Sequence, residues 1–132
     1  MEKTDRELLI KEISSRLPYG IKVQVFGWDE EKGEVAVPLK VYSINTDGYI
    51  SLEYNHYGVE TIYVEYCLLY LRPMSSMTEV EKHIFDTMTR GYTVHQQATL
   101  FDWLNTHHFD YRGLIEKGLA IEVTKDNNPY KE

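Results

Sequence analysis

The chain has 132 residues, of which 42% are hydrophobic and 27% charged, so it can bury a core without disulfides or bound metal. Its formal net charge of −7 argues against nonspecific nucleic-acid binding, because lysines and arginines supply most of that affinity. The single cysteine, Cys67, excludes an intrachain disulfide, and no apolar run approaches the roughly 18–20 residues of a membrane span. We therefore expect one soluble, cytoplasmic domain over residues 1–132, with no cofactor and no membrane contact.

The first predicted element is a helix over residues 1–17. Thr4 and Glu7 match a capping box, in which each side chain accepts a bond from the other residue's backbone N–H. The apolar residues at helical spacing are Leu9, Ile13 and Leu17. Gly20 follows Pro18 and ends the helix.

Residues 21–71 predict an antiparallel meander of about four or five strands, because apolar and polar residues alternate there. The alternating segments are 21–25, 35–41, 50–54 and about 60–71. Pro38 cannot donate to a strand ladder, so its strand is expected to lie at an edge or to contain a bulge. The last segment is apolar on both faces, which predicts that the rest of the chain covers it.

Residues 75–118 predict a helical part that packs on the meander. Ser76 and Glu79 match a second capping box, and Gly91 ends the helix that follows. The predicted apolar stripe of this helix is Val80, Ile84 and Met88.

The end of the chain predicts shorter elements. Thr99 is expected to cap a third helix, and Asp110 a short turn that Gly118 ends. Residues 119–123 predict a final strand, and residues 124–132 a frayed polar tail. The fold class is therefore α+β, with a helix, a meander curled into a small SH3-like barrel or sheet, and a helical C-terminal half.

Three stretches of the sequence carry a resemblance to a known group of proteins. They are Leu17–Val23 (LPYGIKV), Leu71–Thr78 (LRPMSSMT) and Asp102–Ala120 (DWLNTHHFDYRGLIEKGLA). Together they resemble an uncharacterised family of small proteins from gut bacteria and their prophages. The resemblance implies a phage or mobile-element context and assigns no catalytic residue.

A candidate polar cluster follows the third predicted helix. Its members are His107, His108, Asp110 and Arg112. Two histidines and an aspartate are metal-ligand types, so a small metal-dependent enzyme is one hypothesis, although adjacent helical histidines point about 100° apart. The structural alternative places the histidines at a helix C-terminus, Asp110 as a cap, and Arg112 in an ion pair or bonded to backbone carbonyls.

Tyrosine is unusually abundant, with 11 residues against 4 Phe and 2 Trp. Strand alternation predicts that Tyr54, Tyr66 and Tyr70 face the core. The candidate interaction surface consists of the outward Tyr42, Tyr49 and Tyr63, together with Trp103. Exposed tyrosines offer rigid, amphipathic contact area, but tyrosine is also favoured in strands for its packing.

The leading hypothesis is a non-enzymatic protein-binding or assembly domain, with self-association as one way to cover the tyrosines. A metal-dependent enzyme is the alternative, and a nucleic-acid-binding barrel a distant third. Cys67 lies in the most apolar predicted strand, so we expect it in the core rather than as a nucleophile.

Overall fold

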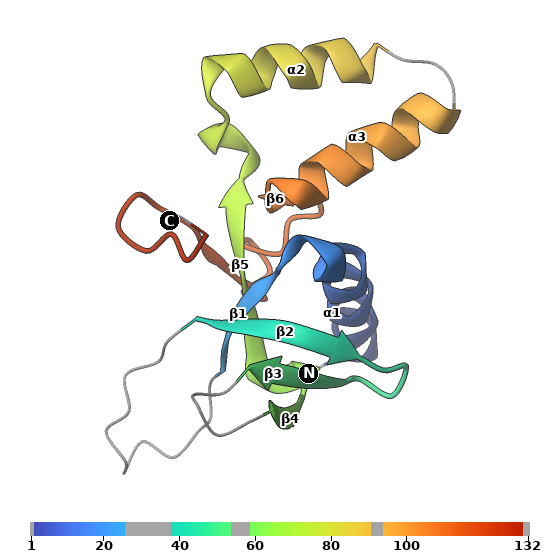
Figure 1. Ribbon diagram of the computed structural model, residues 1–132, viewed down its shortest axis with the longest axis vertical. Helices are drawn as coiled ribbons and strands as arrows, with labels where there is room; N and C mark the ends of the chain where they lie inside the picture. The colour runs from blue at the N-terminus through green and yellow to red at the C-terminus, as the bar shows by residue number, and fades with distance from the viewer. Residues whose placement is uncertain (1, 26–37, 54–58, 91–93, 131–132) are drawn as a thin grey trace.

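A seven-stranded mixed sheet runs through the molecule in the order β4-β3-β2-β1-β5-β6, and β7 also pairs with β5 (Figure 1). The structure, a computed structural model, describes residues 2–25, 38–53, 59–90 and 94–130. The strands are β1 (Lys22–Val25), β2 (Leu39–Ile44), β3 (Tyr49–Glu53), β4 (Val59–Tyr63), β5 (Cys67–Pro73), β6 (Phe109–Asp110) and β7 (Ala120–Glu122). The α-helices are α1 (Lys3–Arg16), α2 (Glu79–Thr89) and α3 (Val94–Thr106), and the 3-10 helices are η1 (Leu17–Tyr19), η3 (Val64–Tyr66) and η4 (Met74–Ser76). The chain is α+β, as predicted.

The sheet is open, so the predicted barrel is wrong. The first four strands pair in sequence order as an antiparallel meander, and β5 returns antiparallel to β1. β5 then takes β6 and β7 as parallel neighbours. Among the described residues the C-terminal part of the chain thus occupies the positions beside β5, and β4 remains at the end of the strand order.

The predicted strand over residues 60–71 is two strands. The 3-10 helix η3 separates β4 from β5, and the backbone N–H of Val64 donates to the carbonyl oxygen of Gly48 at 2.9 Å. Because this turn resets the alternation, Tyr66 is 47% exposed and its predicted core position is wrong, whereas Tyr70 is buried as expected. Residues 35–37 and Tyr54 lie outside the described residues. Pro38 lies just before β2, so it interrupts none of the described ladder.

α1 packs one apolar side against the sheet. Leu9 and Ile13 are fully buried there, as the helical spacing predicts. The other buried members of this core are Ile21, Val23, Val41, Ile50, Leu52, Val64, Cys67, Leu69, Leu71, Leu114 and Leu119. The helix begins at Lys3 with Glu2 as N-cap, so the predicted capping box is wrong: Thr4 already lies inside the first turn.

α2 and α3 form a hairpin at the opposite end of the molecule from β2–β4 (Figure 1). The capping box of α2 is Thr78 with Glu81, two residues later than predicted, and α3 begins five residues before Thr99. The predicted apolar stripe does not face the core as a whole: Val80 is 70% and Ile84 36% exposed, and only Met88 is half-buried. An ion pair from Glu81 to β5 turns a different side of α2 inward.

The predicted frayed tail is wrong for residues 124–130. Tyr130 is half-buried, and its hydroxyl oxygen accepts a bond from the backbone N–H of Lys22 at 3.0 Å. The same hydroxyl donates to the carbonyl oxygen of Tyr70 at 2.8 Å. These contacts hold the C-terminal segment against β1 and β5, and burial raises the pKa of Tyr130.

Candidate functional site

The outer face of β2, β3 and β4 carries the tyrosine face, which we define as Tyr42, Tyr49 and Tyr63. In β3, Ile50 and Leu52 are buried, so Tyr49 between the turn and Ile50 points to the other side. Tyr63 is its direct partner in β4. The register shifts between Val41 and Ser43, and Tyr42 lies at this irregularity, 50% exposed. The three tyrosines therefore lie on the side of the meander away from the core.

Tyr49 and Tyr63 form a pre-arranged pair. Their ring centroids are 4.3 Å apart, and their hydroxyl groups are hydrogen-bonded to each other. This hydrogen bond raises the pKa of Tyr49. The ring contact and the hydrogen bond hold both rings in one arrangement, while Tyr63 remains 39% exposed.

The turn that precedes β3 anchors the tyrosine pair to α1. The side chain of Asn45 accepts bonds from the backbone N–H groups of Asp47 and Tyr49, both at 3.0 Å. Arg6 from α1 donates to the carbonyl oxygen of Asp47 and to Glu65. Gly48 has a φ of +87°, which L side chains rarely adopt, and an added Cβ would displace the Arg6 guanidinium, so this position favours glycine.

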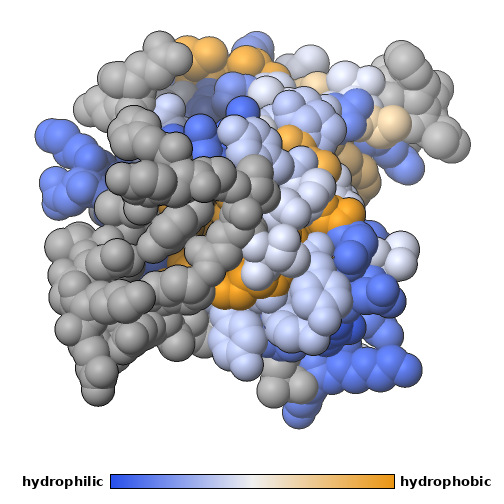
Figure 2. All heavy atoms as spheres, turned by 60° about the horizontal axis from the view of Figure 1, so that its bottom comes forward, coloured by the Kyte–Doolittle hydropathy of each residue, from blue (hydrophilic) through white to orange (hydrophobic). Residues whose placement is uncertain are grey.

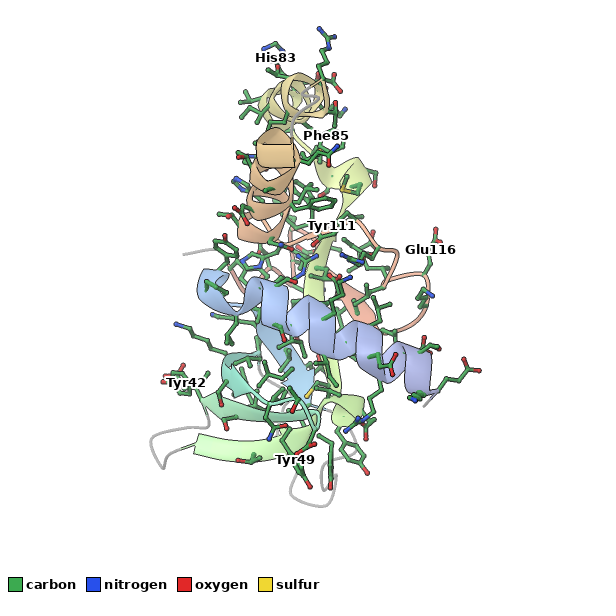
Figure 3. All side chains as sticks on the ribbon, turned by 90° about the vertical axis from the view of Figure 1, so that its right-hand side faces the viewer. Tyr42, Tyr49, His83, Phe85, Tyr111 and Glu116 are labelled. Carbon is green, nitrogen blue, oxygen red and sulfur yellow. The ribbon has the colours of Figure 1, made fainter. Side chains whose placement is uncertain are left out.

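Figure 2 turns this end of the molecule toward the viewer. Weakly polar side chains, coloured pale, lie together in the middle of the face, and strongly hydrophilic ones lie at its border. Figure 3 shows Tyr42 and Tyr49 at the end of the molecule opposite α2. The C-terminal helices therefore leave the tyrosine face uncovered.

Trp103, the fourth residue of the predicted interaction surface, lies elsewhere. It projects from α3 and is half-buried against His107 and Phe109, with ring centroids 5.0 and 5.7 Å away. It belongs to a second core cluster with Met77, Leu104 and Phe109. The structure thus places three of the four residues on one sheet face, of which Tyr49 and Tyr63 are in contact, and places the tryptophan in the packing of the helical end.

The two adjacent histidines after α3 point to different partners. His107 Nδ1 lies 3.9 Å from Glu81 Oε2, beside the pair that Glu81 makes with Arg72. That hydrogen-bonded pair lowers the pKa of Glu81 to about 2. His107 is thus part of the junction between α2, α3 and β5.

His108 turns toward the C-terminal segment instead. Its backbone is left-handed, with φ of +61°, and its ring stacks on Tyr130 with centroids 3.6 Å apart. Burial, followed by the charge of Arg16, lowers the pKa of His108 to about 4. The side chain is 7% exposed, and its Nδ1 has no hydrogen-bond partner within the described part of the chain. His108 therefore remains neutral at pH 7.

Asp110 caps the turn that follows it, as predicted. Its two carboxylate oxygens accept bonds from the backbone N–H groups of Leu114 and Ile115, both at 2.9 Å. Gly118 closes the turn with φ of +74°. Asp110 is 9% exposed, so this carboxylate serves the backbone.

Arg112 pairs with α1 rather than with Asp110 or a backbone carbonyl. Its Nε lies 2.5 Å from Glu12 Oε1. Glu12 Oε2 accepts two bonds from Arg16, at 3.0 and 3.2 Å, and Arg16 also donates to the carbonyl oxygen of Phe109 at 2.7 Å. Glu12 and Arg16 are both fully buried.

We call Glu12, Arg16, His108, Asp110 and Arg112 the polar corner. Sequence reasoning missed Glu12 and Arg16, although one signal was available. They are four residues apart, and Arg16 lies seven residues after the buried Leu9, on the same side of α1. An oppositely charged pair at that spacing beside an apolar stripe predicts a buried ion pair.

The charged groups of the polar corner contact one another and a neighbouring ring. The guanidinium carbons of Arg16 and Arg112 lie 5.1 and 5.4 Å from the centroid of the Tyr111 ring. Within the described residues, no three His, Cys, Asp or Glu side chains come close enough to hold a metal ion. Cys67 is buried, and burial raises its pKa to about 12, so its thiol is protonated at neutral pH.

Comparisons with protein-family models, with curated proteins and with solved structures find no match to this chain. In the described ranges, no helix has the length and hydrophobicity to cross a membrane.

Proposed function

We propose that this chain is a non-enzymatic protein-binding domain and that the tyrosine face contacts the partner. The observation that carries the proposal is the tilted, hydrogen-bonded Tyr49–Tyr63 pair, which shares with the half-exposed Tyr42 a sheet face that α2 and α3 do not cover. Tyrosines supply large contact areas with only two side-chain torsions to fix, which suits them to protein interfaces.

Pre-arrangement of the rings supports the same function. Binding costs free energy whenever mobile side chains must be ordered. The ring contact and the hydroxyl contact already hold Tyr49 and Tyr63 in one arrangement, and the Arg6–Glu65 ion pair at 2.6 Å supports the adjoining turn. A partner that covers these rings therefore orders few mobile side chains, and little free energy is lost in doing so.

A phage or mobile-element context is part of the proposal, and the resemblance of the three sequence stretches supports it. Lysates of prophage-carrying gut bacteria are accordingly the source in which to search for a partner. The acidic chain and the uncharged middle of the tyrosine face favour a protein partner over nucleic acid.

The test is an affinity capture from such a lysate with three immobilised proteins. They are the wild type, the double variant Tyr42→Ser/Tyr63→Ser, and the control Phe101→Ser, which alters an aromatic residue that is 46% exposed at the opposite end. We expect the wild type and the control to retain the same protein, and the double variant to retain it at least about tenfold more weakly. Equal retention by all three, or retention by none, would overturn the proposal.

A further inference from the structure

α2 exposes an apolar stripe that the fold itself does not use. Val80 and Ile84, four residues apart, are 70% and 36% exposed, and no residue of the helix is fully buried. Phe85 lies on the side toward α3, whereas His83 points away from the rest of the molecule (Figure 3). The outward side of α2 is therefore available to a partner.

The inward side of α2 is fixed by its own contacts. Glu81 accepts two bonds from Arg72, at 2.8 and 2.9 Å, and Phe85 packs on the second core cluster. With Glu81 and Phe85 turned inward, helical geometry places Val80, Ile84 and Thr87 about a quarter turn away, on one flank of α2, where Val80 and Ile84 remain exposed. Exposure of the stripe thus follows from how α2 is anchored.

A row of charged and titratable side chains lies beside this stripe. Its members are Glu79, His83, Asp86 and Arg90, at positions i, i+4, i+7 and i+11, and all are exposed. Acidic residues occupy the first and third positions, and basic residue types the second and fourth. Reversing the direction of the row therefore exchanges its acidic and basic positions.

This pattern makes the row complementary to itself in the antiparallel direction. When two copies of α2 lie antiparallel, Glu79 faces Arg90 of the second copy, and His83 faces Asp86 of the second copy. In a parallel pair each residue would face its own copy, which brings like charges together. Antiparallel packing also opposes the two helix dipoles.

We propose that the outer side of α2 is a self-association surface whose occupant is α2 of a second copy, packed antiparallel about a two-fold axis. Ile84 of both copies lies at the centre of the interface, and Val80 lies beside each of the two flanking Glu79–Arg90 pairs. Such an interface is isologous, as in most homodimers. It lies at the opposite end of the molecule from the tyrosine face, so it does not depend on the proposed function.

One helix pair is a small interface, so the dimer is weak, with a dissociation constant on the order of 10⁻⁴ M. Sedimentation velocity of the full chain from about 10 μM to about 1 mM at low salt measures it. Glu79→Arg and Arg90→Glu each place like charges at both flanking pairs, and each should raise the dissociation constant about tenfold or more.

Mixing the two variants gives the deciding measurement. One variant then carries arginine at both flanking positions and the other glutamate at both, so the mixed pair is complementary again. We expect the equimolar mixture to associate as the wild type does. Lys117→Glu, which changes the net charge as Arg90→Glu does but lies in the turn before β7, should leave the constant unchanged.

Three results would overturn the proposal. One is a monomer at every concentration. Another is a dimer that both charge variants leave intact. A dimer that Tyr63→Ser abolishes while the charge variants do not would be such a result. The third is a mixture of variants that associates no better than either variant alone.

Discussion

The polar corner and the tyrosine face lie on opposite sides of α1, and each depends on that helix for its arrangement. In the polar corner the charged groups of Glu12 and Arg16 are fully buried and bonded to each other. In the tyrosine face, the uncharged rings are partly exposed on the outer side of the sheet. The first region uses polar groups to fix the fold, whereas the second presents aromatic surface that the fold does not require.

This difference predicts opposite responses to substitution. Removing one member of a buried, bonded network leaves its partners short of hydrogen bonds that water does not replace. An exposed side chain on a sheet loses little when it is shortened. Changes in the polar corner should therefore lower stability, and changes in the tyrosine face should alter binding instead.

Arg16→Met is expected to have the largest effect, because it leaves the Glu12 carboxylate and the Phe109 carbonyl without their buried donor. The free energy of unfolding, measured in urea, should fall by about 3–5 kcal/mol. Changing both residues, as Glu12→Leu/Arg16→Met, should recover part of this loss, because no buried carboxylate is then left with only the partly exposed Arg112 as its partner. A loss below about 1 kcal/mol for the single variant would contradict the comparison.

The second-largest expected effect is a dependence of the free energy of unfolding on pH, which arises from His108. Its pKa in the folded chain is lowered to about 4, so between pH 4 and 6.5 the unfolded chain binds more protons than the folded one. The contribution of His108 to the free energy of unfolding is complete above about pH 6.5. As the pH falls to about 4 it is lost, and the free energy of unfolding decreases by up to about 3 kcal/mol.

Urea unfolding across this pH range, compared with His108→Asn, measures the histidine's share. Asparagine tolerates the left-handed backbone and carries no charge, so the variant should show a flatter profile. Identical slopes in the two proteins would show that His108 does not cause the dependence.

Asp110→Ala should have a smaller effect, because it removes the acceptor of two backbone N–H groups at one turn. We expect the free energy of unfolding to fall by about 1–2 kcal/mol. Asp110→Asn keeps one carbonyl acceptor and should lose roughly half as much. If the asparagine and alanine variants were equally unstable, the capping role would be in doubt.

Tyr42→Ser should have the smallest effect on stability, because this side chain is 50% exposed at an irregular point of β2. Its free energy of unfolding should stay within about 0.5 kcal/mol of the wild type. A much larger loss would mean that the tyrosine face serves the fold, and the comparison between the two regions would fail.

The sequence predicts the local elements well where one face of an element is buried. Leu9 and Ile13 mark the inward side of α1, and the meander follows from alternation because Ile50 and Leu52 face the core. It also predicts Asp110 as a cap, since that interaction spans only four or five residues.

Long-range pairing explains why the other predictions are wrong. The open sheet depends on β7 joining β5, and the separation of β4 from β5 depends on a bond from Val64 to Gly48. Likewise, Glu81 reaches Arg72 on β5, which turns the apolar stripe of α2 outward. The candidate polar cluster of His107, His108, Asp110 and Arg112 lacked its main partners, because Glu12 and Arg16 come from the other end of the chain.

Tyr130 has a consequence for how the protein is made. Its hydroxyl bonds to the backbone of Lys22, which is 108 residues earlier in the chain, and to that of Tyr70. The ribosome therefore synthesises α1, the meander and the helical hairpin before Tyr130, the residue that contacts β1, β5 and His108. Until Tyr130 has been synthesised, water hydrates the backbone groups of Lys22 and Tyr70 to which it later bonds. We therefore expect the docking of the C-terminal segment to be a late step of folding.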